Sequence, residues 1–366
     1  MRFLILNFRD IKHPHAGGSE RNGHILSKQL VEKGHEVTFF CSAYSGLKSE
    51  EIFEGVKYIR KGNLYTVYLW CFWLYLFKFR KKIDCILEGI NGIPWFTIFY
   101  SRKPRALLLH HVHQKVFFYQ LPWYVAIFAS LAEKSLILFY RWTTVLTVSP
   151  QMVNELVRFG LLRKNINLVY NGIDEGFKVL NKQKTPLLVS VGRVRAYKRL
   201  DLLINAFEKV LVEIPTSKLI IIGAGDDLEN IRELVKEKNL EASINLTGFI
   251  SDEEKKKILG ESWVYCITSS EEGWGIGVIE ANASGCPTVA FSVGGLKDSV
   301  KDGSTGYLVP FGDVSLFSSK VVSLLKDAKL RSKMSKECIN WSKQFTWKNW
   351  TNKIEEVLLE EYKRKN

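Results

Sequence analysis

Two glutamates, Glu272 and Glu280, bracket a glycine-rich stretch in the second half of the chain. Gly273, Gly275 and Gly277 lie between them, after an apolar run typical of a strand and at the start of a segment with helical spacing. Glycine lets a backbone approach a ligand closely, and the free N–H groups at the start of a helix can then bind an anion. A mostly helical span between the two carboxylates covers about 12 Å, enough to place one on each side of a diphosphate. The stretch predicts an anion site, against the alternative of an ordinary buried turn.

A basic cluster follows the first predicted strand of the same half. Arg193 and Lys198 are five residues apart in a loop, where both can reach one phosphate group. Arginine supplies a rigid fork of donors and lysine a compact charge. Together with Arg195 and Arg199 the cluster could be solvated surface, but its position at a strand end beside the anion site favours phosphate binding.

Two further strand ends in this half carry weaker signals. Gly223 and Gly225 form only half of a dinucleotide-binding fingerprint, and no acidic ribose partner is obvious. Phe249 and Ile250 follow the next predicted strand and could line a base pocket through their backbone. The alternative for this second pair is a plain turn.

The first half has its own candidate residues. Gly17 and Gly18 follow the first predicted strand and precede a helix, which predicts a second anion nest or a turn without a ligand. His110, His111 and His113 close another predicted strand, with the last two on one face and the first on the other. Three histidines at one strand end indicate the wall of a cleft.

The elements that must position these residues alternate between strands and helices. In the first half we predict strands at 3–8, 37–41, 85–87, 106–110 and 144–148, and helices at 21–33, 94–100 and 123–140. In the second half we predict strands at 187–191, 218–222, 244–247, 263–267 and 288–291, and helices at 200–213, 228–238 and 252–260, with a final helix at 346–362. This order is typical of α/β folds with parallel sheets, whose ligands bind at the carboxyl ends of the strands. We therefore expect two doubly wound domains that face a central cleft.

The length and composition favour a soluble globular chain of two domains. The 366 residues are 46% hydrophobic and 25% charged, and each half is long enough to bury a core. We expect an N-terminal domain at 1–180 and a C-terminal domain at 181–345. The helix at 346–366 should pack back on the first domain, and the polar residues 178–186 form the linker.

The net charge of +14 is concentrated in the first half. Residues 1–180 contain 24 Lys and Arg against 13 Asp and Glu, and the remainder contains 28 against 25. A basic, aromatic half can bind nucleic acid, an anionic membrane face or a phosphorylated substrate. No zinc ligands, RNP-type aromatics or GXXG clamp accompany it, which argues against nucleic acid.

The apolar run at 64–79 is shorter than the ~20 residues of a membrane span. The sequence leaves open whether 64–79 and 117–140 contact a membrane or are buried core. The six cysteines are scattered in or near apolar runs without metal-ligand spacing, so we interpret them as reduced core residues of a cytoplasmic protein and expect no metal site.

In this order the motifs resemble glycosyltransferase family 4, whose members are retaining enzymes of the GT-B fold. Glu272 to Glu280 is similar to the family's E-x7-E signature, and Gly192-Arg193 with Lys198 is similar to its G-R-x4-K diphosphate motif. Gly17-Gly18 resembles the N-terminal glycine loop. Further matches are Asn171-Gly-Ile-Asp174 and Gly294-Gly295. The resemblance extends over nearly the whole chain and is specific to the family but not to one substrate.

The resemblance implies a nucleotide-diphosphate sugar held mainly by the second half. Arg193 and Lys198 would neutralise the diphosphate leaving group, helped by the backbone N–H groups near Ile276 and Gly277. It also implies that no metal is needed and that no cofactor is tightly bound.

Other implied roles concern the sugar and the ribose. Glu272 would hold sugar hydroxyls and Glu280 the ribose. The family's cleft histidine corresponds best to His110, with His111 as the rival. Trp274 stands where the family usually has Phe, which would reshape the sugar pocket.

The resulting prediction is a retaining glycosyltransferase. It would move a hexose from a UDP- or GDP-sugar to a glycan or polyprenyl-linked acceptor in cell-surface polysaccharide or glycoconjugate synthesis. The basic, aromatic half predicts peripheral attachment to the cytoplasmic, anionic membrane face. The alternatives are a GT-B sugar-nucleotide epimerase and a non-catalytic membrane-associated sugar-binding protein.

Overall fold

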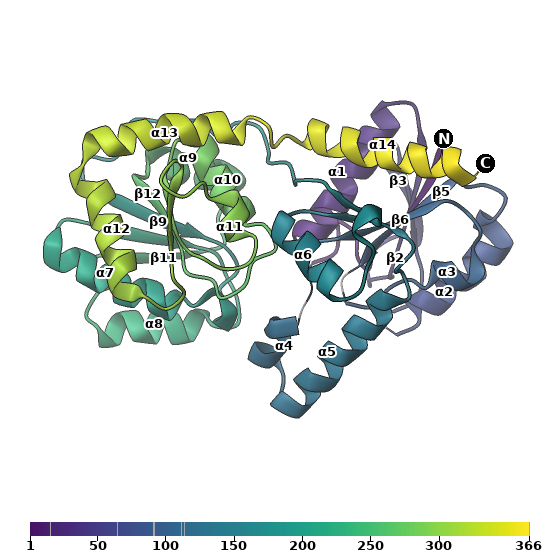
Figure 1. The fold of residues 1–366 in the computed structure, drawn as a ribbon, viewed down its shortest axis with the longest axis horizontal. Helices are drawn as coiled ribbons and strands as arrows, with labels where there is room; N and C mark the ends of the chain where they lie inside the picture. Colours follow the sequence, from purple (N-terminus) through teal and green to yellow (C-terminus); the bar gives the residue numbers. More distant parts are fainter. Residues whose placement is uncertain (15, 64, 91, 111, 113, 366) are drawn as a thin grey trace. The chain divides into compact units, whose positions relative to one another are not determined.

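The chain folds into two compact units, described separately below. The computed structural model describes all residues except 15, 64, 91, 111, 113 and 366. Unit 1 comprises Met1–Gly172 with Trp347–Asn366, and unit 2 comprises Ile173–Thr346 (Figure 1). The first stretch of unit 1 thus ends at Gly172 rather than at the expected 180.

Residues 178–186, expected as the interdomain linker, lie inside unit 2. The Leu180 N–H donates to the Gly260 carbonyl at 3.2 Å, and the Gln183 N–H donates to the Glu261 carbonyl at 3.1 Å. Both acceptors belong to α9 (Asp252–Glu261). The segment lacks periodicity because it runs as an irregular strap along this helix.

Unit 1 is built on an eight-stranded sheet with the order β3-β4-β2-β1-β5-β6-β7-β8. The strands are β1 (Arg2–Leu6), β2 (Glu36–Cys41), β3 (Glu50–Phe53), β4 (Val56–Arg60), β5 (Cys85–Ile90), β6 (Arg105–Leu109), β7 (Thr144–Thr147) and β8 (Ile166–Leu168). β3 pairs antiparallel with β4, and the other described pairings are parallel. The sequence analysis missed β3 and β4, which are short and carry charged residues beside their apolar ones.

The helices of unit 1 flank this sheet (Figure 1). They are α1 (Gly18–Glu32), α2 (Val67–Leu74) with its π-helical extension η1 (Tyr75–Phe79), α3 (Thr97–Tyr100), α4 (Gln114–Gln120), α5 (Trp123–Leu138), α6 (Pro150–Arg158), the short 3₁₀ turn η2 (Arg163–Asn165) and α14 (Trp347–Lys365). α14 contributes Trp350, Ile354, Val357 and Leu358 to the core beneath β1 and β5. The C-terminal segment is therefore an integral part of unit 1.

The run 64–79 has two different faces. Val67, Cys71, Tyr75 and Phe79 recur every four residues and are buried against the sheet. Of the intervening aromatic residues, Trp70, Trp73 and Phe77 are exposed, whereas Tyr68 and Phe72 are half-buried. The sequence left open whether this run contacts a membrane or is buried core. Neither alternative describes it fully, because one stripe of side chains is core and the other faces solvent.

Unit 2 contains a six-stranded parallel sheet with the order β11-β10-β9-β12-β13-β14. The strands are β9 (Leu187–Val191), β10 (Lys218–Ile222), β11 (Ile244–Gly248), β12 (Val264–Ile267), β13 (Thr288–Phe291) and β14 (Gly306–Val309). The remaining elements are η3 (Ala196–Lys198), α7 (Leu200–Glu213), α8 (Leu228–Glu237), α9, α10 (Ile276–Ala283), α11 (Leu296–Ser299), α12 (Val314–Lys326) and α13 (Ala328–Ser342). In chain order this sheet is 3-2-1-4-5-6, the order of the doubly wound nucleotide-binding fold.

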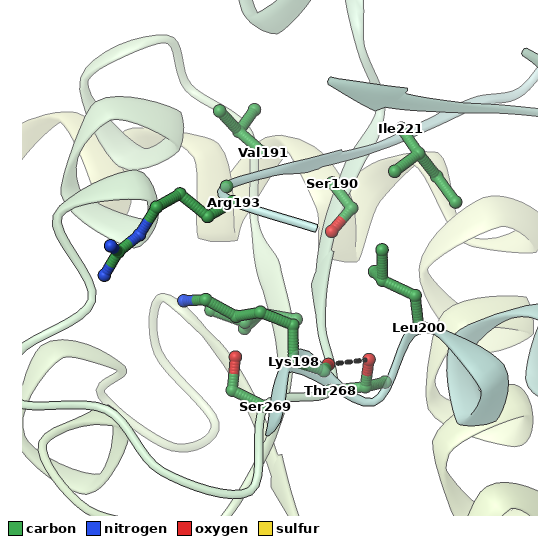
Figure 2. Close-up of a pocket in the computed structure, with 10 residues that line it drawn as sticks. Ser190, Val191, Arg193, Lys198, Leu200, Ile221, Thr268 and Ser269 are labelled. Atoms are coloured by element: carbon green, nitrogen blue, oxygen red, sulfur yellow. Dashed lines mark hydrogen bonds between the residues drawn. The ribbon is translucent and has the colours of Figure 1, made fainter. Parts of the chain in front are cut away.

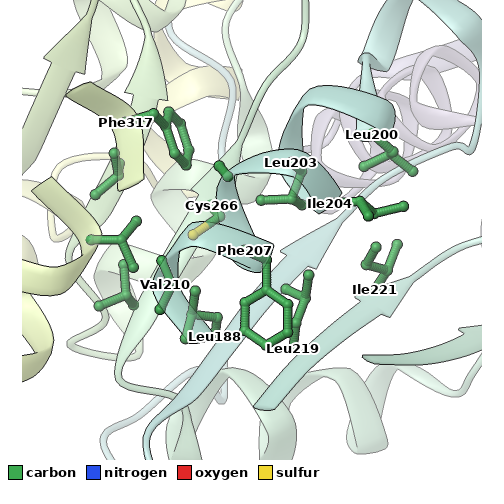
Figure 3. Close-up of a cluster of buried hydrophobic side chains, with 14 of the residues drawn as sticks. Leu188, Leu200, Leu203, Ile204, Phe207, Val210, Leu219, Ile221, Cys266 and Phe317 are labelled. Atoms are coloured by element: carbon green, nitrogen blue, oxygen red, sulfur yellow. The ribbon is translucent and has the colours of Figure 1, made fainter. Parts of the chain in front are cut away.

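The core of unit 2 fixes the strands whose ends carry the candidate residues. α7 presents Leu203, Ile204, Phe207 and Val210 on one face, as its apolar spacing predicts. These side chains pack on Leu188 of β9 and its neighbours in the sheet (Figure 3). Each fully buried side chain of this size contributes about 1.5–3 kcal/mol.

All six cysteines are buried as free thiols. Within the described residues, no helix combines the length and the apolar character that crossing a bilayer requires.

Candidate active site

The strand order of unit 2 reverses between β9 and β12, which is where ligands bind in doubly wound sheets. A pocket opens at this point, at the carboxyl ends of the strands (Figure 2). Its lining includes Val191, Gly192, Arg193, Lys198, Thr268 and Ser269. The structure therefore brings the two predicted phosphate-binding residues, Arg193 and Lys198, to one pocket.

The loop that carries Arg193 is locked by the glycine pair predicted as half of a nucleotide fingerprint. A Cβ atom on Gly223 would lie 1.8 Å from the Gly192 carbonyl oxygen, and one on Gly225 would lie 1.9 Å from the Val194 carbonyl oxygen. Two backbone hydrogen bonds stabilise this close approach. The Gly192 N–H donates to the Ile222 carbonyl and the Val194 N–H donates to the Ala224 carbonyl, both at 3.0 Å. Gly223 and Gly225 thus position the loop through backbone packing.

Arg193 and Lys198 extend toward the same side of the pocket (Figure 2). Arg193 is exposed, and its Nη2 lies 3.5 Å from the Tyr197 hydroxyl. The backbone carbonyl of Lys198 accepts a hydrogen bond from the Thr268 hydroxyl at 3.2 Å, which ties η3 to the end of β12. Both cations thus belong to the loop after β9, which this hydrogen bond attaches to the neighbouring strand β12.

Lys198 forms an ion pair with Glu272, the first of the two bracketing glutamates. The Ser269 hydroxyl donates to the same carboxylate oxygen at 3.0 Å. Burial works to lower the pKa of Lys198, but the Glu272 carboxylate outweighs it and the pKa lies above its ordinary value. The predicted phosphate cation and the predicted sugar-binding carboxylate thus neutralise each other.

The loop of Glu272 is held by a second glycine pair. A Cβ atom on Gly294 would lie 2.3 Å from the Glu272 carbonyl oxygen, and one on Gly295 would lie 2.1 Å from that of Gly273. The Gly295 N–H donates to the Glu272 carbonyl at 2.7 Å. Gly294 and Gly295 therefore act on the site by fixing the Glu272 loop.

The start of α10 is also shaped by glycine. Gly275 has a φ of 85° and offers no side chain to cap the helix, so the first-turn N–H groups of Ile276 and Gly277 are available to an anion. A Cβ atom on Gly277 would lie 2.4 Å from the Tyr265 hydroxyl oxygen. That hydroxyl donates to the Val191 carbonyl at 3.1 Å. Tyr265, which the sequence analysis did not identify, couples α10 to the end of β9.

Trp274 is buried within unit 2. Its side chain is 3% exposed and packs edge-on against Phe345, with ring centroids 5.3 Å apart. Its effect on the shape of the sugar pocket stays a prediction.

Glu280 lies on α10 and is buried. Its Oε1 accepts from the Nζ of Lys255 on α9 at 2.9 Å. Burial raises the pKa of Glu280, and the neighbouring Lys255 only partly opposes this. The sequence offered no signal for Lys255, since its partner is 25 residues away and no motif links them.

Phe249 and Ile250 follow β11. Phe249 is 90% exposed, so its side chain covers no base pocket within unit 2. Only the backbone of this segment remains available for the predicted contact.

The candidate residues of unit 1 also lie at a strand-order reversal, between β1 and β5. His110 lines a small pocket there, and burial lowers its pKa to about 4, so the ring is neutral at physiological pH. The Gly17 N–H donates to the Glu20 carboxylate at 2.8 Å, so one amide of the predicted nest beside Gly18 is already occupied. His111 and His113 lie outside the described residues.

The described part of the chain contains no cluster of three or more His, Cys, Asp or Glu side chains able to hold a metal ion. Independence from metal remains a prediction.

Two family models match the chain, one in each half. The model described as Glycosyltransferase Family 4 matches residues 16–177. The model described as Glycosyl transferases group 1 matches residues 173–341. Together they span both units and every candidate site residue.

Known proteins agree with these matches. The chain is 26% identical to N-acetyl-alpha-D-glucosaminyl L-malate synthase of Bacillus anthracis over 361 residues, which is 88% of each protein. Sucrose-phosphate synthase of Thermosynechococcus elongatus has a similar fold, with a TM-score of 0.82 and 20% identity over 98% of each chain. HepE of Anabaena, solved with UDP-glucose, has a TM-score of 0.78 and 16% identity over 98% of this chain and 100% of its own.

These matches favour a transferase over the epimerase and the non-catalytic binding protein. The chain belongs to glycosyltransferase family 4, and it is a glycosyltransferase with the α/β GT-B fold of two Rossmann-like domains.

Proposed function

We propose that this enzyme transfers a hexose from a UDP- or GDP-sugar to a glycan or polyprenyl-linked acceptor, with retention of the anomeric configuration. The observation that carries the proposal is the Lys198–Glu272 pair in a pocket that Arg193 also lines. These charges match the two parts of a sugar nucleotide, a diphosphate and a polyhydroxylated ring.

Binding of the donor would rearrange this ion pair. A bound diphosphate would compete for Lys198 and join Arg193, and the freed Glu272 carboxylate would accept hydrogen bonds from sugar hydroxyls. The first-turn N–H groups of α10 would add the positive end of the helix dipole. Charge that develops on the leaving phosphate would then meet preorganised donors, which is usually the largest contribution to catalysis.

Glu280 would contact the ribose, as the family resemblance implies. Lys255 already donates to one of its carboxylate oxygens, so a ribose hydroxyl would share Glu280 with that lysine. Retention follows from the family's chemistry, in which the leaving phosphate accepts the proton of the acceptor hydroxyl on the face from which it departs. No pair of carboxylates is proposed as nucleophile and acid.

The donor and the place of action are part of the proposal. A similar fold solved with UDP-glucose supports a UDP-sugar. The excess of cations in the first half and its exposed aromatic residues support action at the cytoplasmic membrane face.

The test is binding and turnover by a matched pair of variants, Lys198→Ala and Lys326→Ala. The second removes an exposed lysine of the same unit, whose pair with Glu213 is more than half exposed. UDP or GDP at 100 times its Kd should stabilise the wild type by about 2.7 kcal/mol in thermal unfolding. Lys198→Ala should abolish that gain and reduce kcat/KM by roughly 100- to 1,000-fold, while Lys326→Ala should change neither.

Stereochemistry is tested separately by NMR of the product formed before mutarotation. An inverted anomer would contradict the retaining mechanism. A wild type that responds to neither UDP nor GDP would contradict the whole proposal.

A further inference from the structure

One face of α5 in unit 1 exposes large apolar side chains to solvent. They recur at helical spacing and are Tyr124, Phe128, Leu131 and Leu138. Phe128 is 74% exposed. The opposite face is anchored, because buried Glu133 accepts from the Gln114 side chain of α4 at 2.8 Å. The pair of helices projects from the sheet of unit 1 (Figure 1).

A second set of exposed rings lies on α2, η1 and α3. Trp73 and Phe77 stack with centroids 5.6 Å apart and planes 8° from parallel, although both are exposed. Ring contacts connect this set to α5. Phe72 of α2 meets Tyr100 of α3 at 5.3 Å, and the adjacent Phe99 meets Phe139 at the end of α5 at 5.6 Å.

The two sets therefore form one continuous face, which we call the aromatic surface. It comprises Trp73, Phe77, Phe99, Tyr124, Phe128, Leu131, Leu138, Phe139 and Trp142. Scattered apolar residues are normal on a protein surface, whereas a joined patch of this kind marks an interaction site.

A buried carboxylate holds this surface in place. Glu88 of β5 accepts from the Tyr140 hydroxyl at 2.9 Å and from the Thr97 hydroxyl. Tyr140 follows α5, and Thr97 begins α3. Because both exposed segments are tied to one strand of the sheet, a partner would meet a preformed face and would not have to order it.

The charge around the aromatic surface is mostly positive, with Glu50 of β3 paired to Lys78 of η1. The sequence contains no acidic residue from 55 to 83, and Glu133, which is buried, is the single acid from 89 to 154. Exposed cations border the surface instead: Arg80, Lys81 and Lys82 follow η1, and Lys134 and Arg141 belong to the α5 region. The Arg141 guanidinium lies 5.9 Å from the centre of the Trp142 ring.

We propose that the aromatic surface of unit 1 binds the headgroup region of an anionic lipid bilayer, with α5 lying in the interface and not spanning it. Aromatic side chains favour the boundary between headgroups and acyl chains, and Lys and Arg side chains reach the lipid phosphates. The excess of cations along the border favours an anionic bilayer over a protein interface, whose rim would mix the two charges more evenly. α5 has 16 residues, too few for the ~20 of a span.

This inference deepens the membrane-face part of the proposed function, yet it depends on different residues from the donor site. It identifies α2, η1 and α5, which lie within the two segments left open by the sequence, as a source of lipid contact. It also predicts that the enzyme takes its acceptor from a surface to which it is already bound.

The first test is flotation of the full-length protein with vesicles of phosphatidylcholine, with and without phosphatidylglycerol. Phe128→Glu/Trp142→Glu should lower the ratio of bound to free protein by at least about tenfold, because two apolar side chains no longer enter the interface. Val212→Glu is the matched control, because Val212 is an equally exposed apolar residue on α7 of unit 2. Its binding should equal that of the wild type.

The second test replaces the cations with Arg80→Gln/Lys81→Gln/Lys82→Gln. Each lysine or arginine near an anionic surface contributes about a fivefold gain, so the triple variant should bind phosphatidylglycerol vesicles roughly 100-fold less tightly and respond less to salt. Its binding to pure phosphatidylcholine should not change. Wild-type protein that fails to float with anionic vesicles, or equal losses in the Val212→Glu control, would overturn the proposal.

A second copy of the chain is the competing occupant of this surface. Light scattering without lipid would reveal it as a dimer that Phe128→Glu/Trp142→Glu dissociates, and that outcome would also overturn the proposal. The shift in thermal unfolding caused by UDP or GDP, measured on the same variants, distinguishes the proposed function from the proposed bilayer surface. A protein that floats but ignores nucleotides contradicts the proposed transfer reaction alone. The reverse result contradicts the bilayer surface and the membrane-face part of the proposed function, and leaves the donor chemistry in place.

Discussion

Unit 2 contains two buried Lys–Glu pairs that use both bracketing glutamates in different ways. Lys198 and Glu272 join two loops at the switch point of the sheet, and each side chain is 15% exposed. Lys255 and Glu280 join two helices, α9 and α10, and their side chains are 15% and 10% exposed. The two pairs have the same residue types and nearly the same exposed fractions. Any difference in their roles must therefore come from the residues around them.

The first pair borders a pocket, whereas the second is surrounded by other side chains. Lys198 lines a pocket that a ligand or water can enter, and Arg193 stands beside it as a second cation. Lys255 lies 5.4 Å from the centre of the Phe177 ring and also contacts Asp252 at 3.4 Å. The proposed mechanism requires a ligand to take over Lys198, whereas loss of Lys255 would leave a buried carboxylate without its cation.

The largest expected effect is on stability, from Lys255→Met. Removing one partner of a buried ion pair typically costs about 3–5 kcal/mol, because the remaining charge is uncompensated. We expect that loss in the free energy of unfolding measured with urea. Lys255→Met/Glu280→Leu should recover much of it, since an apolar pair of similar volume avoids the buried charge.

The control for this prediction is Lys326→Met. It breaks the exposed pair with Glu213, in which both side chains are 55% exposed, and should cost less than about 1 kcal/mol. If Lys255→Met costs no more than this control, the two helices are not held by a buried ion pair and the contrast with Lys198 fails.

The next effect, of roughly 1–3 kcal/mol beyond its control, concerns the glycines that hold the first pair. Gly294→Ala would place a Cβ atom 2.3 Å from the Glu272 carbonyl oxygen and should shift the Glu272 loop. Gly303→Ala provides the control, because Gly303 has a φ of 74° but no atom within 4 Å of its would-be Cβ. Both variants carry left-handed backbone strain, and only the first collides.

We therefore expect Gly294→Ala to lose at least about tenfold in kcat/KM, because a displacement of 1 Å at a catalytic group can cost more than that. Gly303→Ala should lose stability without losing activity. Equal activity in the two variants would show that the position of the Glu272 loop does not matter to the reaction.

These comparisons show what the sequence could and could not provide. Four strands or helices of unit 2, at 187–191, 200–213, 218–222 and 288–291, have the predicted bounds because their apolar spacing is regular. The E-x7-E and G-R-x4-K motifs led to Lys198 and Glu272, but spacing alone could not show that the two side chains pair with each other. That contact joins residues 74 positions apart and depends on how the two loops leave the sheet.

Two other packing contacts could not be predicted from the sequence. Trp274 stands within the glycine-rich stretch, yet its side chain is buried. Gly223 and Gly225 form half of a nucleotide fingerprint, and their close approach in the structure is to the neighbouring loop. A glycine signals that something comes near the backbone, and the sequence does not say whether that is a ligand or another loop.

The smallest effect is the pH dependence of the second pair. Burial raises the pKa of Glu280 in the folded state above its ordinary value of 4.5. A carboxyl group with a raised folded pKa binds more protons when folded than when unfolded, so its contribution to stability decreases as the pH rises through that pKa. Replacing it by Glu280→Gln removes this contribution.

The stability of the wild type relative to Glu280→Gln should thus increase as the pH falls from 7 toward 4.5. The slope cannot exceed about 1.4 kcal/mol per pH unit, the limit for one proton. Urea unfolding of both proteins across this range measures the difference directly. A relative stability that falls with decreasing pH would contradict this prediction. It would mean that the charge of Lys255 outweighs burial and that Glu280 is a stable carboxylate, as Glu272 is in the first pair.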